Sequence, residues 1–436
     1  MMNILKSSII TMLAACTLMA SCRQVPAIDK SFYVKQVEDI FAYWSEYRDS
    51  EFGGILNCIS NDGNTLVSKD KYAWSQGRWL YILSKLNQMS DQFPGIDQKF
   101  VRQWMDETQS FINDKCVYGD DFRTCFLLRQ DGTMVLDEAT GRYDTSIYAD
   151  CFVLIGLSEY SVATGIYNPK TEEIARSIIA RLESGDFLSQ PYEIPSGYTV
   201  HGIPMIMLNT LKVFCDMQKH FGRDCSFEEA YADQCFNLIW DRHYDREHSL
   251  IREYVSTPEN RSVLLADRHI NPGHTLEDIW FIMEQLSDRG TLSEYMGDIE
   301  AIVKKVFELG WDKEYGGLLR YVDYEQADGD QSVRGINTHS AYDELVASTW
   351  DMKLWWSHSE ILYLFTKLYV QTGDKIWLDY YRKSYDYVFA TYPAPDNAEW
   401  IQIRKRDGSP QDRVVALPVK DPFHIMRNFI KIVEIL

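Results

Sequence analysis

Two short segments share a pattern that places a histidine in the first turn of a helix. Residues 271–274 read NPGH and residues 421–424 read DPFH. In each, Asn or Asp caps the helix, and proline fits the first helical position, where its missing N–H costs nothing. The helix dipole at that end disfavours imidazolium, so His274 and His424 should keep the neutral, basic form near pH 7. Two such bases could act on one substrate from different sides.

Each of these histidines also has a plainer interpretation, because a histidine near a helix start is more often a capping or core residue than a catalyst. The duplicated pattern favours catalysis. His201 and His358 are predicted to donate or accept hydrogen bonds in the same pocket. Structural or surface roles are expected for the remaining histidines, which are His220, His243, His248, His269 and His339.

Other polar and aromatic side chains lie near the starts of predicted helices. Trp74 and Arg78 are four residues apart and share a helix face, where a buried arginine needs an anionic or polar partner. Trp356 and Glu360 have the same spacing. Glu277, three residues after His274, could orient that imidazole, bind a hydroxyl or lie exposed in the first turn. The expected substrate-binding residues are Trp74, Arg78, His201, Asn209, Glu277, Trp356, His358 and Glu360.

Helical patterns alternate with turn signals along most of the chain. Asp-Gly pairs stand at 62–63, 131–132, 328–329 and 407–408, and several are flanked by alternating apolar residues that predict β-hairpins. Six hairpins and twelve helices are expected, the helices at 31–47, 69–90, 96–113, 145–164, 170–185, 201–219, 226–241, 271–287, 292–309, 351–371, 375–391 and 421–435.

Six helix–hairpin–helix units predict an all-α fold, a closed (α/α)6 barrel, with an open helical solenoid as the competing architecture. The even-numbered helices should form the inner ring. Their amino ends, which carry the candidate residues, would then gather at one mouth of the barrel.

Composition excludes several classes of function. The 436 residues carry a formal net charge of −20, which disfavours nucleic acid and anionic membrane surfaces as partners. Aromatic residues make up 14 %, enough both to fill the core and to line a pocket for a sugar ring. Neither metal-ligand spacing nor a phosphate-binding glycine loop is found, so no cofactor and no metal are expected. The seven cysteines after Cys22 form no CxxC pair, and most should be buried, with one disulfide left open.

The amino terminus predicts targeting rather than fold. Lys6 precedes a short apolar run at 9–19, and residues 19–22 read MASC, which resembles the lipobox of a bacterial lipoprotein. We expect a signal peptide at 1–22, lipidation at Cys22, a linker at 23–30 and a single catalytic domain at 31–436. The expected location is the cell envelope, on the periplasmic side rather than the cell surface, with the lipid as the only membrane contact.

Seven segments, in order along the chain, are similar to motifs of the N-acylglucosamine 2-epimerase family. The resemblance implies an (α/α)6 barrel and cofactor-free 2-epimerisation or aldose–ketose isomerisation of sugars. It places the proton-transferring histidines at His274 and His424, the substrate-binding arginine at Arg78, the adjacent glutamate at Glu277 and the pocket-lining segment at 353–360. The segments are 49–57 (DSEFGGILN), 71–78 (KYAWSQGR), 148–156 (YADCFVLIG), 271–277 (NPGHTLE), 311–317 (WDKEYGG), 353–360 (KLWWSHSE) and 422–427 (PFHIMR).

The expected chemistry is proton abstraction at C2 of an open-chain sugar of the N-acylglucosamine or N-acylmannosamine type. Returning the proton to the opposite face gives the 2-epimer, and delivering it to C1 gives the ketose. One rival is a glycoside hydrolase that uses carboxylates such as Asp150, Glu277 and Glu360. Another is a sugar-binding lipoprotein without chemistry. The sugar is the expected partner, and a homodimer is left open.

Overall fold

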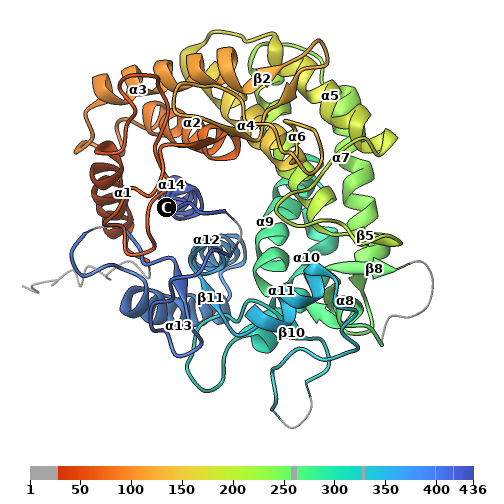
Figure 1. Cartoon of the computed structure of the whole chain (residues 1–436). Coiled ribbons are helices and arrows are strands. Elements are labelled where there is room, and N and C mark those ends of the chain that lie inside the picture. Colours follow the sequence, from red (N-terminus) through yellow and green to blue (C-terminus); the bar gives the residue numbers. More distant parts are fainter. Residues whose placement is uncertain (1–27, 257–262, 327–328, 398, 416) are drawn as a thin grey trace, which may run out of the picture.

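In the part of the chain that the structure describes, twelve long helices form two concentric rings (Figure 1). The computed structural model describes residues 28–256, 263–326, 329–397, 399–415 and 417–436. The inner helices are α2 (Ala73–Gln88), α4 (Ile147–Thr164), α6 (Gly202–His220), α9 (Pro272–Asp288), α12 (Trp355–Thr372) and α14 (Phe423–Ile435). The outer helices are α1 (Lys30–Ser45), α3 (Gln98–Phe111), α5 (Lys170–Ser184), α7 (Ser226–Leu238), α10 (Leu292–Gly310) and α13 (Lys375–Thr391).

The inner ring is closed. Each inner helix contacts the next one, and the last, α14, contacts both α2 and the outer helix α1. An open solenoid would leave its two ends apart, so the contacts of α14 decide between the two architectures. The fold is an all-α (α/α)6 barrel, and the predicted division into inner and outer helices is confirmed.

The difference between the two rings follows from which faces they bury. The outer helix α3 buries Val101, Trp104, Met105 and Thr108, a spacing that covers one side of a helix and leaves the other in water. The inner helix α4 is buried on nearly all sides. Its length and hydropathy would allow it to cross a membrane, but 72 % of that stretch is buried inside the ring. Its apolar composition is therefore that of a core helix.

Helices α2 and α4 approach each other unusually closely, through two glycines. A Cβ placed on Gly156 would lie 2.4 Å from the carbonyl oxygen of Gly77, and a Cβ on Gly77 would lie 2.3 Å from that of Phe152. Only residues without a side chain fit at this crossing. The contact fixes the position of Arg78, which directly follows Gly77.

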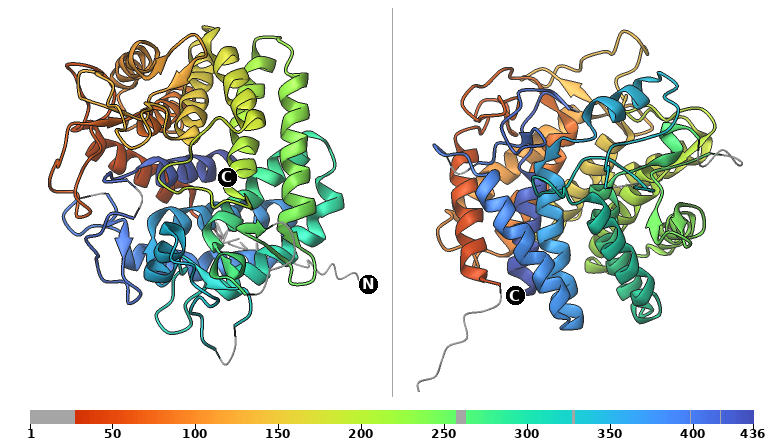
Figure 2. Two further views of the ribbon diagram at one scale, coloured as in Figure 1. Left: turned by 45° about the vertical axis from the view of Figure 1, so that its right-hand side comes forward. Right: turned by 90° about the horizontal axis from the view of Figure 1, so that it is seen from below.

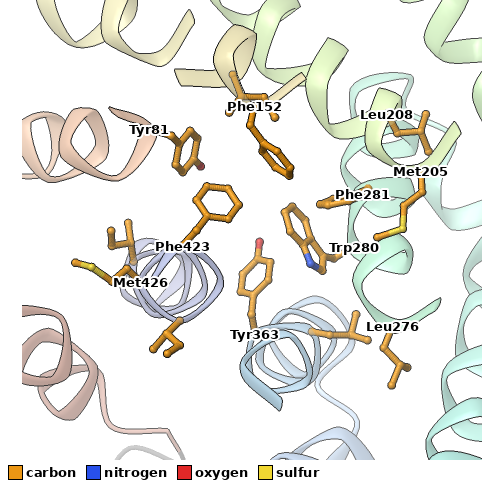
Figure 3. Close-up of a cluster of buried hydrophobic side chains, with 14 of the residues drawn as sticks. Tyr81, Phe152, Met205, Leu208, Leu276, Trp280, Phe281, Tyr363, Phe423 and Met426 are labelled. Carbon is orange, nitrogen blue, oxygen red and sulfur yellow. The ribbon is translucent and has the colours of Figure 1, made fainter. Parts of the chain in front are cut away.

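Aromatic side chains fill the centre of the barrel (Figure 3). Phe423 lies 5.6 Å from Tyr81 and 5.7 Å from Phe152, ring centre to ring centre, and Trp280 lies 5.2 Å from Tyr363. These rings come from five of the six inner helices and meet near the axis. They fill the interior of the ring between the inner helices.

The predicted hairpin turns at 62–63, 131–132 and 407–408 are closed by single bridges, which join Ile59 with Leu66, Leu128 with Met134, and Arg404 with Pro410. Within the described residues the strands form six two-stranded pairs, and only two of these pairs are local hairpins, at turns that the sequence analysis did not predict. Those are β2 (Val117–Tyr118) with β3 (Arg123–Thr124), and β6 (Tyr244–Asp245) with β7 (Leu250–Ile251). The other four pairs join strands that belong to different loops. They are β1 (Lys71–Tyr72) with β4 (Leu127–Leu128), β5 (Tyr198–Val200) with β8 (Tyr254–Ser256), β9 (His269–Ile270) with β10 (Val322–Asp323), and β11 (Lys353–Leu354) with β12 (Ile403–Arg404).

Each of these four pairs begins with the strand that directly precedes an inner helix. A two-residue strand has a free edge, and the next repeat supplies the backbone partner. Consecutive repeats are thus tied together at the amino ends of the inner helices. The strands and longer loops gather at this end of the ring (Figure 2).

Two short helices that the sequence analysis missed cover part of the mouth. They are α8 (Leu265–Arg268) and α11 (Ala341–Thr349). They contribute to a separate hydrophobic cluster, here called the roof, which consists of Val200, Tyr254, Leu265, Ala266, Tyr321, Tyr342 and Val346. π-Helical turns η1 (Ile112–Cys116) and η2 (Ile239–His243) end α3 and α7. The predicted signal segment and Cys22 lie outside the described residues, and all seven later cysteines are buried free thiols.

Candidate active site

One cavity of about 220 Å³ opens under the roof, and the first turns of all six inner helices line it. This arrangement follows from the ring, because every inner helix points its amino end to the same mouth. From α2 to α14, these helices contribute Trp74, Ser75, Arg78, Tyr148, Phe152, Gly202, Met205, Ile206, His274, Glu277, Phe281, Trp355, Trp356, His424 and Arg427.

His274 lies in the first turn of α9, and Asn271 caps that helix as the sequence predicts. The Asn271 side chain accepts a hydrogen bond from the backbone N–H of His274. On the imidazole, Nδ1 lies 2.8 Å from the carboxylate of Glu253. A carboxylate at Nδ1 holds the proton there and leaves the Nε2 lone pair as the base.

Behind Glu253 lies a second histidine, His201, which is fully buried. Its Nε2 lies 2.7 Å from Asp278, and its Nδ1 lies 3.7 Å from the other oxygen of Glu253. Burial lowers the pKa of His201, but the Asp278 and Glu253 carboxylates outweigh burial and raise this pKa to about 9. These two carboxylates thus favour the protonated form of His201, which would place a positive charge behind Glu253.

His424 has an equivalent carboxylate on the other side of the cavity. Its Nδ1 lies 2.7 Å from Glu360, whose second oxygen accepts a hydrogen bond from the indole of Trp280. Arg427 lies 2.5 Å from both Glu360 and Glu277. Burial opposes ionisation of Glu360, yet the Arg427 charge and the His424 hydrogen bond lower its pKa to about 2. Glu360 is thus a permanent carboxylate.

The indole of Trp356 lies between the two histidines. Its ring centre is 5.3 Å from that of His274 and 5.8 Å from that of His424. Gly273 makes this possible, because a Cβ there would lie 2.5 Å from the edge of the indole. Within the described residues, no protein atom hydrogen-bonds to Nε2 of either histidine. Both basic nitrogens are therefore free to act on a ligand in the cavity.

Arg78 lies on the α2 side of the same cavity. It forms an ion pair with Asp421, and its guanidinium lies 3.9 Å from the ring centre of Phe152. Asp421 also caps α14 by accepting from the backbone N–H of Phe423. Helix α14 begins at Phe423, one residue after the proline that was expected at its first position. The ion pair fixes a cation where negative charge on a substrate oxygen could be stabilised.

The structure separates the predicted site residues into three groups. Six line the cavity: Trp74, Arg78, His274, Glu277, Trp356 and His424. Two support the histidines without lining the cavity: His201 behind Glu253, and Glu360 behind His424. Asn209 and His358 do not line the cavity.

The prediction of His358 as a pocket residue is corrected by its contacts. His358 is fully buried, and its Nε2 accepts a hydrogen bond from the backbone N–H of Leu318. Its Nδ1 lies 2.7 Å from the carbonyl oxygen of Leu354, and burial lowers its pKa to about 3. Residues two apart in a helix face about 200° apart, so Trp356 in the cavity directs His358 away from it. His358 anchors a loop.

Sequence reasoning missed Glu253, Asp278 and the supporting role of Arg427. Glu253 lies in the loop just before β8, where no motif marks it. Asp278 follows Glu277 in α9, and the sequence alone does not distinguish it from an ordinary acidic residue near the start of a helix. For Arg427 a signal was available, because an arginine one turn after His424 on a buried helix needs carboxylate partners.

The N-acylglucosamine 2-epimerase family model matches residues 53–427. The chain belongs to this family. It is 25 % identical over 411 residues to the N-acylglucosamine 2-epimerase of Rattus norvegicus, covering 90 % of this chain and 88 % of the relative. The enzyme of the same name from Homo sapiens is 25 % identical over 403 residues, covering 90 % and 86 %.

Solved structures with the same fold include further sugar enzymes. Cellobiose 2-epimerase from Bacillus thermoamylovorans superposes with a TM-score of 0.69 at 16 % identity, covering 94 % of this chain and all of that one. A D-mannose isomerase superposes with a TM-score of 0.69 at 14 % identity, covering 94 % and 98 %. At these identities the likeness shows the barrel alone. Together with the family match, it makes this protein a carbohydrate epimerase or isomerase.

Proposed function

We propose that the protein is a cofactor-independent 2-epimerase of sugars of the N-acylglucosamine and N-acylmannosamine type. One observation carries the proposal. Two histidines from different helices line one cavity, each with Nδ1 bound to a carboxylate and Nε2 free. Inversion at carbon needs two groups that exchange a proton on opposite faces, and this pair supplies both.

The reaction begins with the open-chain aldose, in which the carbonyl at C1 makes the C2–H acidic. Neutral Nε2 of one histidine takes the C2 proton, and the electron pair moves to the carbonyl oxygen to form an enolate that keeps the acylamino group on C2. The other histidine, protonated at Nε2, donates its proton to the opposite face of C2. The carbonyl re-forms, and the two histidines have exchanged protonation states. The reverse reaction uses the same pair with the roles interchanged.

The surrounding charges support each step. Glu253 and Glu360 stabilise whichever imidazole is protonated, because each carboxylate is bound to Nδ1. Arg78 lines the same cavity and can stabilise the negative oxygen of the enolate. General acid–base catalysis typically raises the rate about 10²–10⁴-fold. The electrostatic stabilisation of the intermediate therefore has to supply much of the remaining rate enhancement.

Aldose–ketose isomerisation of mannose-type sugars is the second candidate, because the same proton abstraction from an aldose with a hydroxyl on C2 gives an enediolate. Proton delivery to C1 instead of C2 would give the ketose. Glycoside hydrolysis fits the contacts less well. Asp150 is buried in an ion pair with Arg181, and the low pKa of Glu360 deprives it of the proton that a general acid needs.

The test is proton NMR in D2O with N-acetylglucosamine and, separately, N-acetylmannosamine. Wild-type protein should replace the C2 proton by deuterium and form the 2-epimer. His274→Asn and His424→Asn should each abolish inversion, while each retains deuterium exchange with only one of the two epimers. Neither of these sugars can form a ketose, because C2 carries nitrogen, so mannose is tested in a separate sample, where formation of the ketose would support the isomerase instead. Unchanged inversion in either variant would exclude the two-histidine mechanism.

A further inference from the structure

The cavity contains one cation whose charge no carboxylate balances. The other charged side chains that line it are paired: Glu253 with His274, Asp421 with Arg78, and Glu277 with Arg427. Arg320 also lines the cavity, on the side of the roof. Within the described residues, Arg320 has no Asp or Glu partner.

Neutral groups hold the Arg320 guanidinium in place. Nη1 donates to the hydroxyl of Thr349 at 3.1 Å, and Nη2 lies 2.9 Å from the hydroxyl of Tyr192 and 3.4 Å from the carbonyl oxygen of Val415. The residue is only 7 % exposed. A guanidinium has five N–H donors, so these three contacts leave donors for a ligand.

A buried cation without a counter-ion is costly, because burial removes its water and neutral acceptors do not cancel its charge. If the only role of Arg320 were to hold these loops together, a neutral amide side chain could make the same hydrogen bonds. Two loops and the last residue of α11, far apart in sequence, converge on Arg320 and fix its position before any ligand arrives. These are the properties of a preformed anion site.

We propose that Arg320 binds an anionic substituent of the sugar, so that the preferred substrate is an acidic derivative bearing a carboxylate, sulfate or phosphate. The proposal rests on the proposed epimerase function and narrows its substrate class. Arg320 contacts neither catalytic histidine, so the anionic group belongs on the part of the sugar away from C1 and C2. A substituent at C3 or C6 meets this condition and leaves C2 free to react.

The experiment compares neutral and acidic sugars that share the same C2 chemistry. The panel is N-acetylglucosamine, its 6-sulfate, its 6-phosphate and N-acetylmuramic acid, which carries a carboxylate on its C3 ether. Deuterium exchange at C2 gives kcat and KM, and calorimetry gives the dissociation constant. The variants are Arg320→Gln and Arg320→Lys. Arg413→Gln is the matched control, since Arg413 is exposed and its guanidinium contacts Ser348, the residue before Thr349.

We expect at least one acidic sugar to exceed N-acetylglucosamine in kcat/KM by about 10- to 100-fold, the range of a hydrogen bond to a charged group. Arg320→Gln should remove this preference, mainly through KM, Arg320→Lys should keep part of it, and Arg413→Gln should keep all of it. If Arg320→Gln lowers kcat/KM equally for acidic and neutral sugars, Arg320 has only a structural role and the proposal is overturned. Absence of any preference in the wild type would overturn it as well.

Calorimetry separates this proposal from the catalytic one. If no sugar is turned over, the epimerase proposal fails, but tighter binding of an acidic sugar that depends on Arg320 still supports the anion site. If neutral sugars are epimerised and acidic ones bind no better, the epimerase stands and the anion site fails.

Discussion

Glu253 lies 2.8 Å from Nδ1 of His274, although 21 residues separate the two in the chain. The carboxylate comes from the loop before β8 and the imidazole from the first turn of α9. Their contact makes the histidine a base at Nε2 rather than at Nδ1, and so links a loop without a motif to the reacting atoms of the substrate.

Replacing Glu253 by Gln should lower kcat about 10- to 100-fold while KM changes less. The amide cannot stabilise an imidazolium, and it can turn its N–H2 towards Nδ1, which would favour the wrong tautomer. Epimerisation rates followed by NMR provide the measurement. Glu247→Gln, an exposed change in the nearby β6–β7 turn, is the control and should retain wild-type rates. Equal rates in both variants would contradict the assigned role of Glu253.

His201 should make stability depend on pH. Its pKa is about 9 in the folded protein, against an ordinary value of 6.5, so its contribution is complete below pH 6.5 and is lost as pH rises through 9. The loss should amount to about 3 kcal/mol in the free energy of unfolding. Urea unfolding at pH 6.5, 8 and 10 measures it.

The matched comparison for that pH series uses two histidine variants. His201→Gln should show a flatter dependence of stability on pH than wild type. His339→Gln, which removes an exposed histidine, should follow the wild-type curve. Parallel curves for wild type and His201→Gln would show that another group accounts for the alkaline loss.

His358→Gln should keep activity within about threefold of wild type, whereas His358→Ala should lose stability. The reason is a repeat within the fold. Gln76 lies five residues after Lys71 and accepts from the backbone N–H of Ile55, as His358 lies five residues after Lys353 and accepts from that of Leu318. A buried N–H left without an acceptor costs about 1–3 kcal/mol. A large fall in kcat for His358→Gln, with stability unchanged, would return His358 to the catalytic site.

Gly156→Ala should destabilise the protein by about 1–3 kcal/mol and lower activity, because α2 and α4 must separate to admit a methyl group and Arg78 moves with α2. Thermal unfolding and NMR rates test the two effects. Gly297→Ala in α10 is the control: nothing lies within 4 Å of its added Cβ, and alanine favours the helix. Equal melting temperatures for wild type and Gly156→Ala would show that the crossing is less tight than described.

The outer helices could be predicted because each buries one face, which leaves a local period, and inner helices such as α4 because they are long apolar runs between turn signals. The helix expected at 145–164 is observed at Ile147–Thr164, and the one at 271–287 at Pro272–Asp288. The helix expected at 69–90 begins at Ala73 instead. Lys71 and Tyr72 pair with a strand more than fifty residues later, and local periodicity carries no information about such a partner.

The candidate site was predicted only where its residues belong to local sequence patterns. His274, His424 and Arg78 were found because their helix starts carry recognisable patterns. Glu253 reaches the site through tertiary contact alone. One signal was available but unused: D-x3-GG occurs at 49–54 and 312–317, and each Asp pairs with a buried lysine, Lys71 or Lys353. This repeat would have identified His358 as the counterpart of Gln76, a structural residue.

The direction of the barrel has a consequence for any tether. Helix α1 begins, and the chain ends, at the face of the ring opposite the strands and the mouth (Figure 2). An attachment through residues that precede α1, such as a lipid on Cys22, would therefore hold the barrel with its opening turned away from the supporting surface. Sugars would then approach from the surrounding fluid, and the first turns of the inner helices would face outward to meet them.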